Sequence, residues 1–426
     1  MQHAGILLVD VAGPDAAAVI EAASRLSLDV HAVAQTGTWG ALDESLRAMI
    51  STHTCTDFAL YEASVDTIVD TAERTGAAGI TTVNEFLTPL AARAALRLGL
   101  PGLAPDGVVW GARNKIEMAH SFAAHGVAAP RTFVVRSEEE IHTLWRRGEV
   151  RFPFVVKPAD GAGSVGVTVV SCPELIGEAY RSAGDHRVNV PYALPVDERT
   201  VVQNYVDGIE YSVESVVQAG RIHHICLVEK VTTAGSARVD LGFCLPARVD
   251  PASRDAMLHE VSRAIRAIGI ADGVTHTEVK IAQGKCFVIE IGARIAGGHI
   301  GALVKAALGV DLWQACVDAA VSHTVNIQPT RERYAALRFI TSPHEGRFVR
   351  TTGLPPAGGD VLAAHVRRRS GDRVAGPDSS KGRIGHVIVA ADDAETANTR
   401  VEALLRQVHV VVEGDRAGSR PAPRPA

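Results

Sequence analysis

The 426-residue sequence contains no apolar run long enough to span a bilayer, and this excludes an ordinary transmembrane helix. Its six cysteines are scattered without a CxxC motif or a Cys/His cluster, which argues against a zinc site and favours reduced, mostly buried thiols. The net charge of −5 gives no reason to expect a nucleic-acid partner. Residues 1–10 show no basic region followed by a cleavage site, so we expect a cytoplasmic protein without a membrane partner.

Lysine is also scarce, because only seven of the 43 basic residues are lysines. Ordinary basic positions in this sequence are therefore filled by arginine. A lysine that stands inside a motif is then favoured as a residue whose ammonium group is needed there. The seven lysines are Lys115, Lys157, Lys230, Lys280, Lys285, Lys305 and Lys381.

Length and composition predict a globular protein of two to four domains, since 46% of the residues are hydrophobic and 21% are charged. Changes in pattern along the chain suggest an α/β domain at 1–112 and a small α+β module at 113–200. A second α+β region is expected at 201–330, and a further α+β unit at 331–412. Residues 413–426 are rich in proline and charge, and we expect them to be disordered.

The first domain alternates strands and helices, which predicts a parallel sheet with crossover helices. Strands are expected at 6–9, 30–33 and 78–82, and helices at 16–27, 64–75 and 85–98. The first turn, Asp10 to Pro14, lacks the GxGxxG pattern, so a nicotinamide-dependent oxidoreductase has little support. Asn84 follows the third expected strand, where it would face a ligand or cap the next helix.

The later regions show a mixed pattern that predicts a multidomain α/β and α+β fold. Segment 184–200 is polar and rich in proline, and we expect a loop there. Strands are expected at 132–135, 154–157, 167–170, 201–205, 211–218, 221–230 and 383–390, and two more in the stretch at 273–299. Helices are expected at 116–125, 138–147, 251–268, 300–322 and 394–408.

The most informative stretch, residues 273–299, is predicted to begin with two strands joined by a tight turn at Gln283-Gly284. Each strand carries one carboxylate, Glu278 and Glu290. A three-residue loop would place these two carboxylates opposite one another. A two- or four-residue loop would pair Glu278 with Ile289 and separate the carboxylates, because side chains alternate along a strand.

Two facing carboxylates repel each other unless a cation lies between them, and a divalent ion with oxygen ligands would remove the conflict. Arg294 follows the second strand as a bidentate donor for phosphate or carboxylate. Gly297 and Gly298 would let a ligand approach the backbone. His276 shares the strand face of Glu278, as a site residue or as a packed core histidine. The alternative for the whole stretch is a solvated hairpin with surface charges.

A glycine-rich turn, Asp160 to Gly166, follows the strand that ends at Lys157. Its backbone N–H groups and the Ser164 hydroxyl could bind phosphate, and the Lys157 ammonium would lie beside them. Lys115, at the start of a helix, could reach the same phosphates. No GK[ST] follows, so the turn is not a P-loop. A plain flexible turn and surface lysines are the alternatives.

The segment from Val201 to Glu214 is predicted to be a strand, a glycine turn and a second strand. The polar end of its first strand could present backbone groups to an adenine edge. Glu210, in the second strand, could accept hydrogen bonds from ribose hydroxyls. A hairpin with a solvated acid is the alternative.

These motifs, in this order, resemble the carboxylate–amine ligase branch of the ATP-grasp superfamily. The similarity extends over the whole chain and is most specific at residues 113–310. It implies an ATP-grasp fold with a pre-ATP-grasp domain, a small lid, a nucleotide-binding core and a C-terminal domain. The segments Thr275–Lys280 and Glu290–Ile300 are similar to L-amino acid ligases, which make dipeptides.

The resemblance implies a role for each matching residue. Lys115 and Lys157 match the phosphate-binding lysines, and 160–166, with Ser164, matches the mobile lid loop. Gln203 to Val206 matches the adenine hinge, with backbone contacts from Asn204 and Val206, and Glu210 matches the ribose-binding acid. Glu278 and Glu290 match the Mg²⁺ ligands, and Arg294 matches the arginine that steadies the transferred phosphoryl group. His276, Gly297 and Gly298 would lie at the substrate.

The resemblance further implies ATP and Mg²⁺ (or Mn²⁺) as cofactors, small-molecule carboxylate and amine substrates, and a homodimer. The expected reaction activates a carboxylate as an acylphosphate and joins it to an amine, giving an amide or dipeptide with ADP and phosphate. One departure is Gly292, where many family members have an asparagine that binds metal. The alternatives are a formate- or bicarbonate-activating ATP-grasp enzyme, and a nucleotide-binding protein without catalytic activity.

Overall fold

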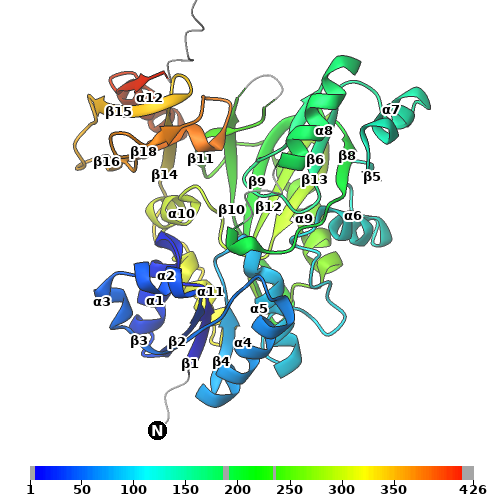
Figure 1. Cartoon of the computed structure of the whole chain (residues 1–426). Helices are drawn as coiled ribbons and strands as arrows, with labels where there is room; N and C mark the ends of the chain where they lie inside the picture. The colour runs from blue at the N-terminus through cyan, green and yellow to red at the C-terminus, as the bar shows by residue number, and fades with distance from the viewer. Residues whose placement is uncertain (1–4, 186–190, 234–236, 415–426) are drawn as a thin grey trace, which may run out of the picture.

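The computed structural model describes residues 5–185, 191–233 and 237–414, so most of the tail expected to be disordered lies outside them. The N-terminal region is a parallel sheet of order β3-β2-β1-β4 (Figure 1). Its strands β1 and β2 are almost wholly buried, as parallel strands covered by helices must be. The strands are β1 (Gly5–Val9), β2 (Asp29–Ala34), β3 (Ile50–Cys55) and β4 (Ala77–Thr81), and the helices are α1 (Pro14–Arg25), α2 (Thr36–Ala41), α3 (Glu44–Arg47), α4 (Tyr61–Thr75) and α5 (Thr88–Leu98).

The second region, drawn at the upper right of Figure 1, is built on an antiparallel sheet of order β5-β8-β6-β7. Asn114 caps α6 by accepting hydrogen bonds from the backbone N–H groups of Ile116 and Glu117. Strand β8, which ends at Asn204 inside the segment expected to form the adenine hinge, pairs with β5 and β6 of this sheet. The elements are α6 (Lys115–Ala124), β5 (Thr132–Val135), α7 (Glu138–Arg146), β6 (Phe154–Pro158), β7 (Thr168–Val170), α8 (Ile176–Asp185) and β8 (Thr200–Asn204).

An eight-stranded antiparallel sheet of order β13-β12-β9-β10-β11-β14-β18-β16 forms the centre of the molecule. Because β11 pairs with β14, the sheet continues from the region at 201–330 into the unit at 331–412. Its strands are β9 (Ile209–Gln218), β10 (Arg221–Thr232), β11 (Asp240–Leu245), β12 (Gly273–Ala282), β13 (Lys285–Gly292), β14 (Tyr334–Thr341), β16 (Val361–Val366) and β18 (Arg383–Ala391).

Helices pack on the faces of this sheet, α9 against β12 and β13, α11 against β9 and β12, and α12 against β14 and β18. Among the described helices, none is alone long and apolar enough to cross a bilayer; α10 and α11 reach that length only as a pair, and they bend by 105° at the break between them. The remaining elements are α9 (Pro251–Ile268), α10 (Ile300–Leu308), α11 (Leu312–Ala320), α12 (Ala394–Leu405), β15 (Gly346–Thr352), β17 (Arg373–Val374) and β19 (His409–Glu413).

The hairpin of β12 and β13 corrects the expected link between loop length and pairing. The loop has two residues, Gln283 and Gly284, because Ala282 pairs with Lys285. Both loop residues have positive φ, as a type I′ turn requires. Glu278 nevertheless pairs with Glu290, because a β-bulge beside Glu278 shifts the register by one residue. The carboxylates are therefore opposite, but the bulge and not the loop places them there.

Several other expectations also differ from the structure. Strand β3 has exposed and half-buried residues in alternation at the edge of its sheet, and its polar composition hid it. Strand β11 and helix α8 were not expected either, and α8 extends into the segment at 184–200 that was expected to be a loop. The helix expected at 394–408 ends at Leu405, and β19 begins at His409. All six cysteines are free thiols, four of them buried.

Candidate active site

One large cavity lies between the central sheet, the second region and the N-terminal domain. Its empty volume is about 1450 Å³, a figure that includes the open solvent at its mouth. Seven lysine and arginine side chains line it against five carboxylates, so its walls favour an anion. All the residues expected at the site line this cavity, namely Lys115, Lys157, Ser164, Gln203, Asn204, Val206, Glu210, His276, Glu278, Glu290, Arg294, Gly297 and Gly298.

Lys115 connects the hairpin to the glycine-rich turn. Its Nζ atom lies 3.0 Å from Glu290 Oε1 and donates to the carbonyl of Gly161 at 2.7 Å. The backbone N–H of Lys115 also donates to the carbonyl of Ala159, at the end of β6. Arg113 donates to the carbonyls of Asp160 and Gly161. The base of the glycine-rich turn is therefore fixed to the start of α6 by charged side chains.

Lys157 is a cation of this wall whose ammonium group has no partner among the described residues. Its side chain is only 4% exposed, and it makes no hydrogen bond among the described residues. Burial lowers the pKa of Lys157 to about 8, although Glu290 partly opposes this shift. A buried ammonium without a partner is poised to take an anionic ligand, because the ligand would supply the missing charge.

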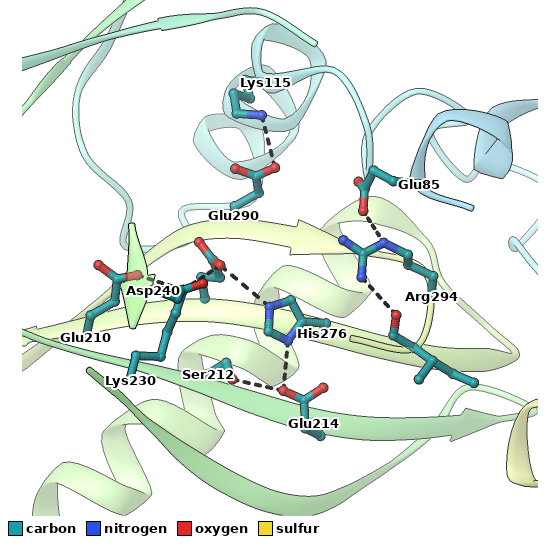
Figure 2. A network of polar contacts seen from close by, with 12 residues as sticks. Glu85, Lys115, Glu210, Ser212, Glu214, Lys230, Asp240, His276, Glu290 and Arg294 are labelled. Carbon is teal, nitrogen blue, oxygen red and sulfur yellow. Dashed lines mark hydrogen bonds and ion pairs between the residues drawn. The ribbon is translucent and has the colours of Figure 1, made fainter. Parts of the chain in front are cut away.

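Lys230, on β10, is held by three carboxylates from neighbouring strands (Figure 2). Its Nζ atom lies 2.7 Å from Glu278, 2.8 Å from Glu210 and 3.3 Å from Asp240. Burial opposes the charge, but the three carboxylates raise the pKa of Lys230 well above its usual value. Burial likewise opposes the charge on Glu278, but Lys230 and His276 hold the pKa of Glu278 well below its usual range. This cluster therefore fixes the Glu278 carboxylate in its ionised form.

His276 lies between two carboxylates. Its Nδ1 atom is 2.8 Å from Glu214 Oε1, and its Nε2 atom is 3.6 Å from Glu278 Oε1. Glu214 is fully buried and also accepts a hydrogen bond from the Ser212 hydroxyl at 2.9 Å (Figure 2). Burial lowers the pKa of His276, but Glu214 and Glu278 outweigh burial and raise it to about 9. His276 is therefore a charged neighbour of Glu278 and not a packed core histidine.

Arg294 connects the end of the hairpin to the N-terminal domain. Its Nε atom donates to Glu85, and its Nη1 atom donates to the carbonyl of Ile295 at 2.8 Å. Burial raises the pKa of Glu85, but Arg294, Arg113 and Lys115 outweigh it and leave the pKa below its usual value. The third guanidinium nitrogen has no hydrogen bond among the described residues, and Figure 2 shows it turned toward Glu290 and His276.

The hinge segment lies at the other end of the cavity. The backbone N–H of Asn204 donates to the carbonyl of Arg131 at 3.1 Å and is therefore occupied. The backbone N–H of Val206 makes no hydrogen bond among the described residues, so it can serve a ligand. The Gln203 amide lines the cavity and donates to the Thr132 hydroxyl at 2.8 Å.

The Gly297–Gly298 segment closes the cavity near Arg294. Gly298 has a φ of 68°, and a Cβ atom there would lie 2.7 Å from the ring of Phe243. Any side chain would therefore meet both backbone strain and a steric clash. The glycine keeps this wall of the cavity close to the aromatic ring and leaves its backbone accessible.

The donor set suits a magnesium ion. Glu278 and Glu290 face each other across the hairpin and both line the cavity. Among the described residues, no group of three or more His, Cys, Asp or Glu side chains is arranged to hold a metal. Mg²⁺ is usually bound by one or two carboxylates together with substrate phosphates, so two carboxylates in a cavity that lysine and arginine side chains also line fit this ion.

Sequence reasoning left several cavity residues without a role. Four of the seven lysines line the cavity, so the scarcity of lysine could have identified Lys230 and Lys280. For Glu85, the only signal in the sequence was its position after the end of an expected strand. Asp240 and Arg383 had no signal, because β11 was not expected and no motif surrounds Arg383.

Comparison with protein families gives three matches along the chain. An ATP-grasp N-terminal domain matches residues 20–102, an ATP-grasp domain matches residues 150–302, and the L-amino acid ligase C-terminal domain 2 matches residues 338–413. The three matched segments follow one another along the chain, and each contains residues that line the cavity. They confirm the fold that the sequence motifs implied.

Among curated proteins, the chain is 27% identical to alanine–anticapsin ligase of Bacillus subtilis (strain 168) over 274 residues. This match covers 60% of the chain and 57% of that relative, so the chain matches little more than half of its length. Among solved structures, the L-amino acid ligase from Bacillus licheniformis superposes with a TM-score of 0.82 at 23% identity, covering 97% of this chain and all of that one.

A more distant structure is the biotin carboxylase domain of Hydrogenobacter thermophilus 2-oxoglutarate carboxylase, which was solved with MgADP, ADP and bicarbonate. It superposes with a TM-score of 0.70 at 18% identity and covers 97% of this chain and 92% of that chain. At these identities, both solved structures support the shared fold.

Proposed function

We propose, from the premise that this chain belongs to the ATP-grasp superfamily and is similar to L-amino acid ligases, that it joins a carboxylate to an amine at the expense of ATP. The acid would be activated as an acylphosphate, and the amine would be that of an amino acid. The observation that supports this most directly is the pairing of Glu278 with Glu290 in a cavity that also holds Lys115, Lys157 and Arg294.

The nucleotide would lie along the cavity from the hinge to the hairpin. The N–H of Val206 would meet the adenine edge, and Glu210 would accept from the ribose. Lys115 and Lys157 would contact phosphate oxygens, while the loop at 160–166 would add backbone amides and the Ser164 hydroxyl. Lys157 is suited to this role because its buried ammonium has no partner among the described residues.

Glu278 and Glu290 would hold Mg²⁺, for which Mn²⁺ could substitute, together with phosphate oxygens. When bound, the ion neutralises the charge that develops on the transferred phosphoryl group. The network supports this role by keeping the Glu278 carboxylate ionised between Lys230 and His276. Gly292 has no side chain and therefore supplies no side-chain oxygen to the ion.

The reaction would proceed in two steps. A carboxylate oxygen of the acid attacks the γ-phosphorus, the bond from that phosphorus to the bridging oxygen breaks, and ADP leaves. The amine nitrogen then attacks the acyl carbon, the acyl carbon–oxygen bond breaks, and phosphate leaves as the amide forms and the nitrogen releases a proton. The free nitrogen of Arg294 would hold the transferred phosphoryl group through both steps, and the Gly297–Gly298 backbone would position the acid.

Closure of the second region over the cavity would protect the acylphosphate from water. We assign the regions accordingly, with residues 1–112 as the pre-ATP-grasp domain, 113–200 as the lid, 201–330 as the nucleotide- and metal-binding core, and 331–412 as the C-terminal domain. Strand β8 lies at the boundary between the lid and the core and pairs with strands β5 and β6 of the lid sheet. It would therefore move with the lid.

We also propose that the protein is a homodimer in the cytoplasm. It would act on small molecules, without nucleic-acid or membrane partners. The net charge of −5 agrees with the absence of a polyanion partner. Light scattering coupled to size-exclusion chromatography would measure the oligomeric state.

The test is a screen of phosphate and ADP release with ATP, Mg²⁺ and all pairs of amino acids. Hydroxylamine is included in a parallel series, because it captures an acylphosphate as a stable hydroxamate. We expect one group of amino acids to give hydroxamate and a subset of pairs to give dipeptide. Formate and bicarbonate serve as comparison acids, and activity with these alone would favour the formate- or bicarbonate-activating alternative. Nucleotide binding without ADP formation from any acid would favour a protein without catalytic activity.

A further inference from the structure

Arg383 is the one residue of the C-terminal unit, among the described residues, that lines the large cavity. It is the first residue of β18 and pairs with Thr341 on β14. No motif of the sequence surrounds it, and the roles proposed above do not use it.

The side chain of Arg383 is held firmly in place. Its Nε and Nη2 atoms both donate to the backbone carbonyl of Asp240, at 3.1 and 2.8 Å, and its Cζ atom lies 4.2 Å from the ring centre of Phe339. Its Nη1 atom makes no hydrogen bond among the described residues. The side chain is 18% exposed, so a preorganised donor remains open toward the cavity.

Two chains of contacts place Arg383 at the end of the cavity where the acid and the phosphoryl group would lie. The Asp240 carboxylate lies 3.3 Å from Lys230, which contacts Glu278 at 2.7 Å. Phe339 packs edge-on against Phe243 at 5.9 Å, and Phe243 borders Gly298. Arg383 is therefore linked through these contacts to both Glu278, a proposed metal ligand, and the glycine segment.

The other cations of the cavity have partners or proposed roles elsewhere in it. Lys115, Lys157 and Arg294 face the phosphate position, and Lys230 is held by three carboxylates. Lys280 and Arg238 both lie over the ring of Tyr205 at the hinge. The Nη2 atom of Arg383 lies 3.7 Å from the Asp240 carboxylate, but its Nη1 atom has no hydrogen bond among the described residues and remains for a second anionic group at the substrate end.

An amino acid that supplies the amine brings such a group, because its own carboxylate is not consumed in the reaction. Burying this carboxylate without a cationic partner would be costly. Burial and the neighbouring Arg367 lower the pKa of Arg383, although Asp240 opposes them, so an added anion would also relieve the guanidinium. We propose that Arg383 binds the free carboxylate of the amino acid that supplies the amine, an assignment that rests on the ligase function proposed above.

The test compares two amine components, the amino acid found in the screen and its α-carboxamide. The carboxamide has the same side chain and amine but no negative charge, and it cannot serve as the acid. Arg383→Met keeps the side chain over Phe339 and removes the charge. Arg333→Met is the matched control, because Arg333 belongs to the same unit, is paired with Asp392 at 3.2 Å and lies outside the cavity.

We expect wild-type protein to prefer the free amino acid by about 10- to 100-fold in kcat/KM, the range given by losing one charged hydrogen bond. Arg383→Met should lose this preference to within about threefold, mainly through a higher KM for the free amino acid. Arg333→Met should keep the wild-type preference. Arg383→Lys should recover part of it, because it restores the charge without the bidentate geometry.

The assignment is overturned if wild-type protein uses both amine components equally. It is also overturned if Arg383→Met lowers activity with both by the same factor, since the side chain would then only support Asp240. Hydroxamate formation separates this failure from that of the ligase function. Wild-type protein that forms hydroxamate but shows no preference keeps the ligase function and loses the Arg383 assignment. Protein that forms neither hydroxamate nor dipeptide with any amino acid loses both.

Discussion

The cavity contains two charged clusters that are built in different ways. In the first, Lys115 pairs with Glu290 and Glu85 pairs with Arg294, so each pair joins the hairpin to a segment before residue 120 (Figure 2). In the second, Lys230 meets its three carboxylates from strands β9 to β12 of a single sheet. The first cluster therefore requires three regions to come together, whereas the second forms with the sheet itself.

This difference in construction indicates that the two clusters have different roles. A one-to-one pair such as Lys115 with Glu290, in which the carboxylate is 27% exposed, can exchange its partner for a phosphate or a metal ion. Lys230 is 3% exposed and surrounded by acids, so it cannot change partners without leaving buried charges alone. The first cluster is suited to chemistry, and the second is suited to holding Glu278 in position.

The largest effect is expected in the first cluster, from Glu290→Gln. Losing this carboxylate removes a proposed metal ligand, and ADP formation should fall by about 10³-fold or more. The melting temperature should change by only a few degrees, because the side chain is part exposed. Steady-state ADP release and thermal unfolding measure the two quantities. Glu149→Gln, at an exposed ion pair with Arg131, is the control that should keep full activity.

If Glu290→Gln retained ADP formation, the first cluster would not be the metal site. A large loss of stability without a specific loss of activity would instead make Glu290 a structural residue, and the contrast between the two clusters would disappear.

In the second cluster, Lys230→Met should lower the free energy of unfolding, an effect that an activity assay alone would not reveal. Removing the cation leaves Glu210, Asp240 and Glu278 close together and buried, which should cost about 3–5 kcal/mol of unfolding free energy. Urea denaturation measures the change. Lys305→Met, at a lysine that is 51% exposed, should change stability by less than about 0.5 kcal/mol. Equal small losses in both variants would contradict the structural role of Lys230.

His276 and Glu214 extend the second cluster, and their pairing predicts a pH-dependent contribution to stability. The folded pKa of His276, about 9, is above the unfolded value of about 6.5, so the stabilisation is complete below about pH 6.5 and is lost as the pH rises through about 9. Glu214→Gln should therefore cost about 2–3 kcal/mol near pH 6 and very little near pH 10. Denaturation curves across this range test the sign. A penalty that does not vary with pH would mean that His276 is neutral in the folded protein.

The smallest effect belongs to Lys157, which lines the same cavity as the first cluster but has no ion pair among the described residues. Its pKa of about 8 means that the free protein loses this charge above about pH 8, so nucleotide binding there must take up a proton. The dissociation constant for MgADP should rise by at most about tenfold per pH unit above pH 8. Calorimetry in two buffers of different ionisation enthalpy measures the proton uptake. Lys157→Arg should abolish it, since arginine stays charged. No proton uptake in the wild-type protein would place Lys157 away from the phosphates.

The sequence was most informative where one motif held the whole feature. The hairpin with Glu278 and Glu290, the start of α6 at Lys115 and the glycine-rich turn were all visible from residue types and spacing. Each is local, so the chemistry of neighbouring residues decides its form. The arginine after the hairpin was likewise placed by its distance from the strand end.

The rest depended on contacts between distant segments. Glu85 reaches Arg294 across 209 residues, and Asp240 reaches Lys230 only because β11 pairs with β10. The bulge beside Glu278 is also a property of the folded sheet, because the loop length alone predicts a different partner for Glu278. Periodicity predicts which side chains share one face of a strand. It does not predict which strand lies alongside in the sheet, or where a β-bulge adds a residue to the register.

The most direct test of the central claim follows an oxygen atom. The acid component is labelled with ¹⁸O in its carboxylate, and the phosphate released during amide formation is examined by mass spectrometry. If the cavity transfers the γ-phosphoryl group to the carboxylate, each phosphate released carries one ¹⁸O from the acid. Unlabelled phosphate, formed together with the amide, would show that the acid is not activated as an acylphosphate and would contradict the account.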